Sequence, residues 1–167
     1  MKDDNNSKAY LRLRLHVEEG NISVAGARTV EGPLTTSDKF SSKLAYEVTI
    51  GSKRIATGSI PDVGVNRSFP NPDGSETQTG HYFVELPSYE FDVRIPREVL
   101  PSRSSLTQAE IALYRIKGTA KQSISSDNRL LLQDQFRGEL REVGRLKGIP
   151  IKKLPKSVQA EISRFFR

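Results

Sequence analysis

The sequence predicts a mainly β protein, an antiparallel β-sandwich of about seven strands followed by two C-terminal α-helices. Three observations support this prediction. Apolar and polar residues alternate along much of the first two-thirds of the chain, Gly- and Pro-containing turn sequences separate these stretches, and the apolar spacing becomes helical near the C-terminus. The strand number is also typical of an immunoglobulin-like shape, although the chain has no Cys or Trp of the kind that marks an antibody domain.

The central hairpin is predicted at residues 44–60, LAYEVTIGSKRIATGSI. Apolar residues occupy every second position of its first arm: Leu44, Tyr46, Val48 and Ile50. This is the period of a strand with one buried face, so Ala45, Glu47 and Thr49 are expected on the other face. Gly51 can adopt the positive φ of a tight hairpin turn, and the return arm is expected to begin near Lys53.

Five further strands are predicted from the same alternation, at residues 10–17, 22–30, 81–86, 89–95 and 109–117. Turn sequences such as Gly20-Asn21 and Gly32-Pro33 separate neighbouring strands. Residues 61–80 contain three prolines and three glycines. Each proline removes a backbone donor, so this segment is predicted to be a long loop, and loops of that length are often functional.

The apolar period changes after residue 127. Four apolar residues are spaced four, four and three apart, which predicts a helix over residues 128–146: Leu132, Phe136, Leu140 and Val143. A second helix is predicted from Pro155, with an apolar stripe of Val158, Ile162 and Phe165. Both stripes need a partner surface, and we expect them to pack against the sandwich of the same chain or in a homodimer.

Composition divides the chain into three parts. We predict a disordered leader at residues 1–8, a β-sandwich domain at 9–117 and a basic helical segment at 118–167. The last segment has 11 Lys and Arg residues against five Asp and Glu, so it holds the whole net charge of +6. No apolar run approaches the ~20 residues that span a bilayer. The first ten residues lack a secretory pattern, which favours a cytoplasmic location.

The sequence offers little support for an enzyme. Without Cys there is no thiol nucleophile or thiolate metal site, and no nucleophile-elbow, phosphate-loop or zinc-protease motif is present. His81 could approach Asp73 and Glu76, but the spacing of residues 71–82 does not match a calcium-binding loop. We therefore expect no catalytic residues, no metal and no cofactor.

Two binding functions remain. The leading hypothesis is a protein-interaction module that uses the 61–80 loop and a neighbouring sheet edge to bind a protein partner or a second copy of itself. Its candidate residues are Arg67, Phe69, Asp73, Glu76 and His81. The alternative is binding of nucleic acid or another anionic surface by the basic helices. Its candidate residues are Arg137, Arg141, Arg145, Lys152 and Lys153. This alternative is less favoured, because aromatic residues that could stack on bases are not interleaved with these cations.

Overall fold

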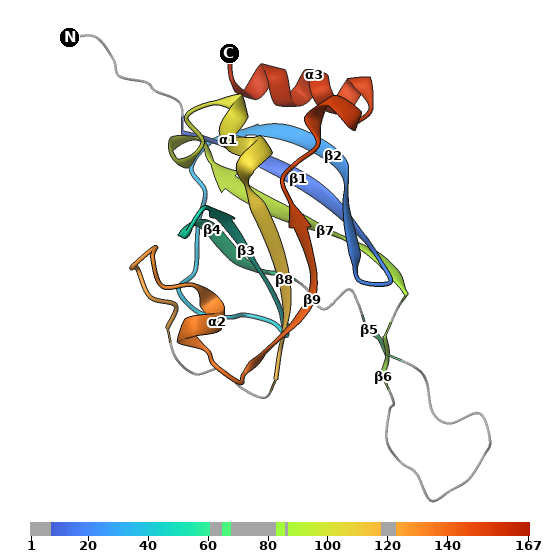
Figure 1. The fold of residues 1–167 in the computed structure, drawn as a ribbon, viewed down its shortest axis with the longest axis vertical. Helices are drawn as coiled ribbons and strands as arrows, with labels where there is room; N and C mark the ends of the chain where they lie inside the picture. The colour runs from blue at the N-terminus through green and yellow to red at the C-terminus, as the bar shows by residue number, and fades with distance from the viewer. Residues whose placement is uncertain (1–7, 61–64, 68–82, 86, 118–122) are drawn as a thin grey trace, which may run out of the picture.

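The computed structural model describes residues 8–60, 65–67, 83–85, 87–117 and 123–167, and two antiparallel β-sheets form its body (Figure 1). The first sheet has the strand order β2-β1-β7, with β1 at Ala9–Glu18, β2 at Asn21–Glu31 and β7 at Ser88–Pro96. The second sheet has the order β4-β3-β8-β9. Its strands are β3 (Leu44–Ile50), β4 (Lys53–Ile60), β8 (Glu110–Ile116) and β9 (Leu140–Lys147). The predicted antiparallel sandwich is confirmed.

Shorter elements connect or flank the two sheets. The described helices are η1 (Arg97–Val99), α1 (Arg103–Gln108), α2 (Leu132–Gln135), η2 (Ile151–Lys153) and α3 (Lys156–Phe165). Strands β5 (Val65–Arg67) and β6 (Phe83–Glu85) pair only with each other, so the predicted strand at 81–86 joins neither main sheet. In the parts of the chain that the structure describes, no helix is long and apolar enough to cross a membrane.

The main core lies between the two sheets. The inward residues of β1 and β7 follow the predicted alternation: Leu11, Leu13, Leu15 and Val17, then Tyr89, Phe91, Val93 and Ile95. Leu44, Tyr46 and Val48 face them from β3. Helix α3 lies beside β2 and buries Val158, Ile162 and Phe165 in the same core, so the predicted second helix and its apolar stripe are confirmed.

The predicted helix over residues 128–146 is wrong. Only the four residues of α2 are helical, Gly138 turns the chain with a φ of +79°, and Leu140–Lys147 pairs with β8 as strand β9. Leu132 and Phe136 do face one side as predicted, because they flank a single helical turn. Leu140 and Val143 fit the same helical spacing but belong to a strand, because residues 140–147 form hydrogen bonds with the edge of β8. This stabilisation comes from a distant part of the chain, so the spacing of apolar residues does not predict it.

Residues 123–136 cover the outer face of the second sheet; we call them the cover segment. Ile124, Leu132 and Phe136 form a second apolar cluster with Ala112 and Tyr114 of β8. As a result β3 is buried on both faces, including Ala45, Glu47 and Thr49. The expectation of a single buried face for this strand is therefore also wrong, because a segment distant in sequence covers the other side.

The two borders of the sandwich differ. Strand β9 lies beside β2, and the approach is close: a Cβ at Gly144 would clash with the carbonyl oxygen of Gly20 and lie 3.1 Å from Ile22 Cγ1. Strands β4 and β7 lie beside each other at the opposite border, but no strand pairing joins them in the described structure. The sandwich is therefore tightly closed at β9 and leaves two strand edges facing each other at β4 and β7.

Candidate functional site

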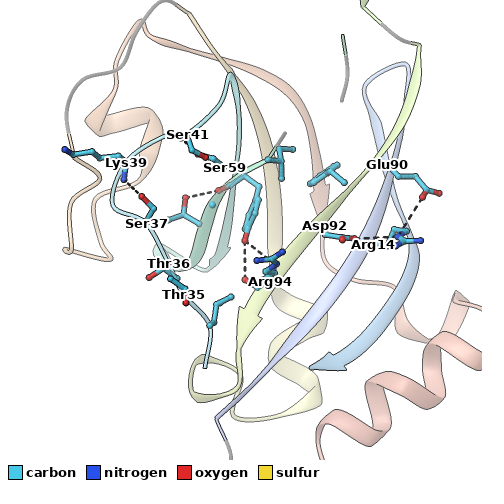
Figure 2. A pocket seen from close by; sticks show the side chains of 16 residues that line it. Arg14, Thr35, Thr36, Ser37, Lys39, Ser41, Ser59, Glu90, Asp92 and Arg94 are labelled. Atoms are coloured by element: carbon cyan, nitrogen blue, oxygen red, sulfur yellow. Dashed lines mark hydrogen bonds and ion pairs between the residues drawn. The ribbon is translucent and has the colours of Figure 1, made fainter. Parts of the chain in front are cut away.

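A cleft of about 530 Å³ opens between the edges of β4 and β7 (Figure 2). We call it the β4–β7 cleft. Residues 34–41 form one of its walls, and the outward row of β7, Glu90, Asp92 and Arg94, lies across from them. The lining is rich in hydroxyl groups, which come from Thr35, Thr36, Ser37, Ser41, Thr57 and Ser59. A cleft of this size and polarity can hold a segment of polypeptide or a polar small molecule.

The wall of residues 34–41 is attached to the second sheet. The N–H of Ser41 donates to Ser59 Oγ at 2.9 Å, and the Ser42 hydroxyl donates to the carbonyl oxygens of Leu44, at 3.1 Å, and Ile60. The Phe40 ring packs edge-on against Phe136 of the cover segment, with 4.9 Å between ring centroids. The wall is therefore fixed by hydrogen bonds and by packing, although it has no regular secondary structure.

Tyr46 connects the two sheets at the floor of the cleft. Its hydroxyl accepts a hydrogen bond from the N–H of Arg94 at 3.2 Å and donates to the carbonyl oxygen of the same residue at 3.4 Å. The ring crosses β4 at Gly58, where a Cβ would lie 2.8 Å from the Tyr46 ring. Tyr46 is only 5 % exposed, and burial raises the pKa of its phenol above the ordinary value. The Tyr46 hydroxyl thus makes the two backbone hydrogen bonds with Arg94 that a neighbouring strand would otherwise make.

The contact with Tyr46 also shows which way the edge of β7 points. The N–H and C=O of one residue in an antiparallel strand face the same side, and the side alternates along the strand. Since those of Arg94 face Tyr46 and the cleft, those of Asp92 and Glu90 face the cleft as well. Both residues line it, and β1 pairs with the opposite edge of β7. The cleft therefore presents a strand edge suited to pairing with an added strand.

The charge of the cleft is positive overall. Arg14 Nε lies 3.6 Å from Asp92 Oδ1 and 3.9 Å from Glu90 Oε2, and Arg12 Nε lies 4.0 Å from Asp92 Oδ2. These pairs match the two carboxylates of the lining with two arginines. Arg94 adds a further cation, whereas the side chain of Lys39 extends from the 34–41 wall away from β7 (Figure 2). An acidic ligand is therefore favoured over a basic one.

We predict that Tyr46→Phe will lower the free energy of unfolding by about 1 kcal/mol, because the Arg94 N–H and C=O lose their partner. The raised pKa of Tyr46 adds a pH signature. The folded state holds the phenolic proton more tightly, so the stability of the native protein should fall as pH rises above the ordinary tyrosine value of 10.0. The variant should lack this part of the decrease. Urea denaturation between neutral pH and pH 11 measures both effects.

Tyr10→Phe is the matched control, since Tyr10 lies half-buried on the outward row of β1. We expect it to change the free energy of unfolding by less than about 0.5 kcal/mol. Equal losses for both variants would contradict the bridging role of the Tyr46 hydroxyl.

The structure separates the residues predicted for anion binding. Residues 140–147 form a strand and α2 ends at Gln135, so Arg137, Arg141 and Arg145 do not lie on a helix, and the prediction of a basic helix at these residues is wrong. Arg145 is neutralised: its guanidinium lies 3.1 Å from Glu110 Oε2 and 2.7 Å from Glu142 Oε1. Arg137 and Arg141 are exposed near the α2 end of β9. Lys152 and Lys153 are exposed on η2, beyond the other end of that strand.

The residues predicted for partner binding can be placed only in part. Arg67 belongs to β5, whose backbone pairs with β6. Phe69, Asp73, Glu76 and His81 lie outside the described residues. Their role in binding stays a prediction.

Sequence reasoning missed a buried polar network under the cover segment. Glu47, 2 % exposed, accepts a hydrogen bond from the Leu132 N–H at 2.7 Å. Arg54, 8 % exposed, donates to the carbonyl oxygens of Leu130, at 2.8 Å, and Ser125. Burial raises the pKa of Glu47, while the Leu132 hydrogen bond and the Arg54 charge oppose the shift. Glu47 was expected on the face opposite the buried row of its strand, because it alternates with Tyr46 and Val48.

Nearby, burial and the charge of Glu47 raise the pKa of Tyr114 to about 12. The Tyr114 hydroxyl accepts a hydrogen bond from Arg145 at 3.2 Å. The residues of this network are engaged with the cover segment and with one another, so the network holds the cover segment against the second sheet.

No known protein family matches the chain, and neither a curated protein nor a solved structure matches it at a significant level. Among the described residues, no three His, Asp or Glu side chains are grouped closely enough to hold a metal ion. The structure defines the class of the molecule as a two-sheet antiparallel β protein, and its function has to be inferred from the β4–β7 cleft itself.

Proposed function

We propose that the protein is a non-enzymatic interaction module that binds an extended, acidic segment of a partner protein as an added strand on β7. The observation that carries this proposal is the orientation of the β7 edge: the backbone groups of Glu90 and Asp92 face an open cleft. Backbone pairing of this kind supplies affinity without a particular side-chain sequence, and pockets beside the edge supply selectivity.

The surroundings of this edge support the same ligand. Hydroxyl groups on the 34–41 wall can bond to side chains of an inserted strand, and Arg94 favours carboxylates. Strand β4 ends at Ile60 and β7 begins at Ser88, so the loop at 61–80 is covalently attached to both borders of the cleft. We include its candidate residues in the proposed partner surface for this reason. An immunoglobulin-like shape, a cytoplasmic location and self-association stay predictions.

Glu90→Pro tests the proposal, because it removes a backbone donor that faces the cleft while leaving the pairing with β1 intact. The probe is a fluorescein-labelled, end-capped peptide of about eight residues that alternates Val and Glu, near the usual length of a strand. We expect Glu90→Pro to weaken binding about tenfold or more in fluorescence anisotropy. Glu90→Ala removes the same carboxylate but keeps the N–H, so its affinity should stay within about threefold of that of the native protein.

Two further experiments separate the contribution of backbone hydrogen bonds to peptide affinity from the contribution of side-chain charge. A peptide methylated at alternate backbone nitrogens cannot form the ladder and should bind poorly. Arg94→Glu should weaken the Val–Glu peptide and strengthen a matched Val–Lys peptide. Thermal melts check that each variant is folded. Equal binding by folded Glu90→Pro and Glu90→Ala, or by the methylated and unmethylated peptides, would contradict strand addition at β7.

A further inference from the structure

A second cavity, of about 690 Å³, lies where α1, the end of β9 and η2 meet. Four cations line it: Arg103 from α1, Lys147 from β9, and Lys152 and Lys153 from η2. Two hydroxyls, from Ser104 and Thr107, complete its polar lining, and no described carboxylate belongs to it. We call it the basic pocket. Its volume is within the range of about 300–1,000 Å³ that small-molecule sites usually have.

The backbone of the basic pocket is fixed by close packing. Gly148 has a φ of +76°, its N–H donates to the Ala109 carbonyl oxygen at 2.8 Å, and a Cβ there would lie 2.7 Å from the Thr107 carbonyl oxygen. This turn brings the chain directly against the end of α1. Ile149 and Ile151 are buried in the main core on either side of Pro150. The backbone that carries Lys147, Lys152 and Lys153 is therefore fixed before a ligand binds. Binding then loses less conformational entropy than it would on a flexible segment.

Helix α3 supports the pocket from behind. The guanidinium of Arg103 donates to Ser163 Oγ at 3.2 Å, and Gln159 Nε2 donates to the carbonyl oxygens of Lys152 at 3.4 Å and Leu154 at 2.7 Å. Glu110 pairs with Lys147 in the strand register, but its carboxylate lies 3.1 Å from Arg145 Nη1. The neighbouring acid is thus engaged with another cation, and the positive charge of the pocket is available to a ligand.

We propose that the basic pocket binds a small ligand that carries several adjacent phosphate groups. Four cations from three elements around one cavity match a compact, multiply charged anion, and Arg103 can add bidentate hydrogen bonds. The exposed Pro150 offers an apolar surface for an uncharged body beside the phosphates. This site is distinct from the β4–β7 cleft, so each proposal can fail without the other.

A nucleic acid strand fits the charge distribution less well. It would need a continuous track of cations, but Arg141 and Lys147 lie at opposite ends of β9, ~20 Å apart at about 3.3 Å per residue. Arg145, between them, is neutralised by Glu110 and Glu142. Lys147, Lys152 and Lys153 are instead gathered around the basic pocket.

The test is isothermal titration calorimetry of the full chain with inorganic tripolyphosphate, a nucleoside triphosphate, inorganic phosphate and duplex DNA at constant ionic strength. We expect tripolyphosphate to bind, and inorganic phosphate to bind more weakly. The double variant Lys147→Gln with Lys153→Gln should lose affinity for tripolyphosphate by about 100-fold, about tenfold per charge-assisted contact. If the nucleoside triphosphate binds more tightly than tripolyphosphate, the nucleoside contacts the apolar surface of the pocket. If the two bind equally, the pocket recognises the phosphate chain alone.

Lys53→Gln is the matched control, because Lys53 is exposed at the β3–β4 turn and does not line the basic pocket. Lys53→Gln should leave the affinity for tripolyphosphate within about twofold of that of the native protein. Lys147→Arg, which keeps the positive charge, should retain most of the native affinity. Thermal melts without ligand confirm that the variants are folded. The proposal is overturned if tripolyphosphate does not bind, if Lys53→Gln weakens it as much as the double variant does, or if duplex DNA binds more tightly than tripolyphosphate.

Discussion

Residues 1–117, produced without the rest of the chain, are expected to remain unfolded. Without β9, one edge of β8 is left unpaired. The truncated chain also lacks seven buried apolar side chains: Leu132, Phe136, Ile149, Ile151, Val158, Ile162 and Phe165. At about 1.5–3 kcal/mol for each buried side chain, this loss is as large as the whole stability of a typical domain, about 5–15 kcal/mol. Far-UV circular dichroism and size-exclusion chromatography measure the outcome. Cooperative unfolding at the midpoint of the full chain would instead show that residues 118–167 are a separate segment.

Gly144→Ala tests the same pairing without deleting any residue. A Cβ at position 144 would clash with the Gly20 carbonyl oxygen, so the backbone must shift, at a cost of about 1–3 kcal/mol. Gly26→Ala in β2 is the matched control, because its Cβ would lie 3.7 Å from the Cβ of Arg14, an ordinary contact distance. Equal melting temperatures for the two variants would contradict the close approach of β9 to the β1–β2 turn.

Glu47→Ala is expected to lower the free energy of unfolding by about 3 kcal/mol. The substitution leaves the buried Leu132 N–H without its acceptor and removes the negative charge that faces buried Arg54. The cover segment should detach first, so limited proteolysis should cut within residues 123–136 before the sheets unfold. Urea denaturation with mass spectrometry of early fragments measures both effects. An unchanged midpoint with no early cleavage would show that packing of Leu132 and Phe136 alone holds the segment.

Glu47→Gln is the matched control, since its amide oxygen can still accept from Leu132. It should cost less than Glu47→Ala, and it should also change the pH dependence of stability. The pKa of Glu47 is raised in the folded state, so the folded protein binds this proton more tightly, and native stability should fall as pH rises from the ordinary value of 4.5 through the folded pKa. The Gln variant should lack this part of the decrease.

The sequence by itself determined the elements whose pattern is local. The alternation in residues 10–17 and 89–95 is the direct result of side chains pointing to opposite faces of a strand, and both became core strands. Pro155 and the spacing of Val158, Ile162 and Phe165 likewise define α3, because a helix is stabilised by contacts within a few residues. The excess of Lys and Arg over Asp and Glu after residue 117 is likewise a property of the sequence alone.

Only the tertiary structure decided which surfaces those elements share. Leu140 and Val143 fit a helical period, but the open edge of β8 gave residues 140–147 a better hydrogen-bond partner as a strand. The burial of Glu47 depends on a segment about 85 residues away in the chain, as the Leu132 contact shows. The β4–β7 cleft and the basic pocket are likewise built from residues that are far apart in the sequence. A local pattern defines a strand or a helix but is compatible with many packing partners. Which partners it has depends on the packing of the whole chain.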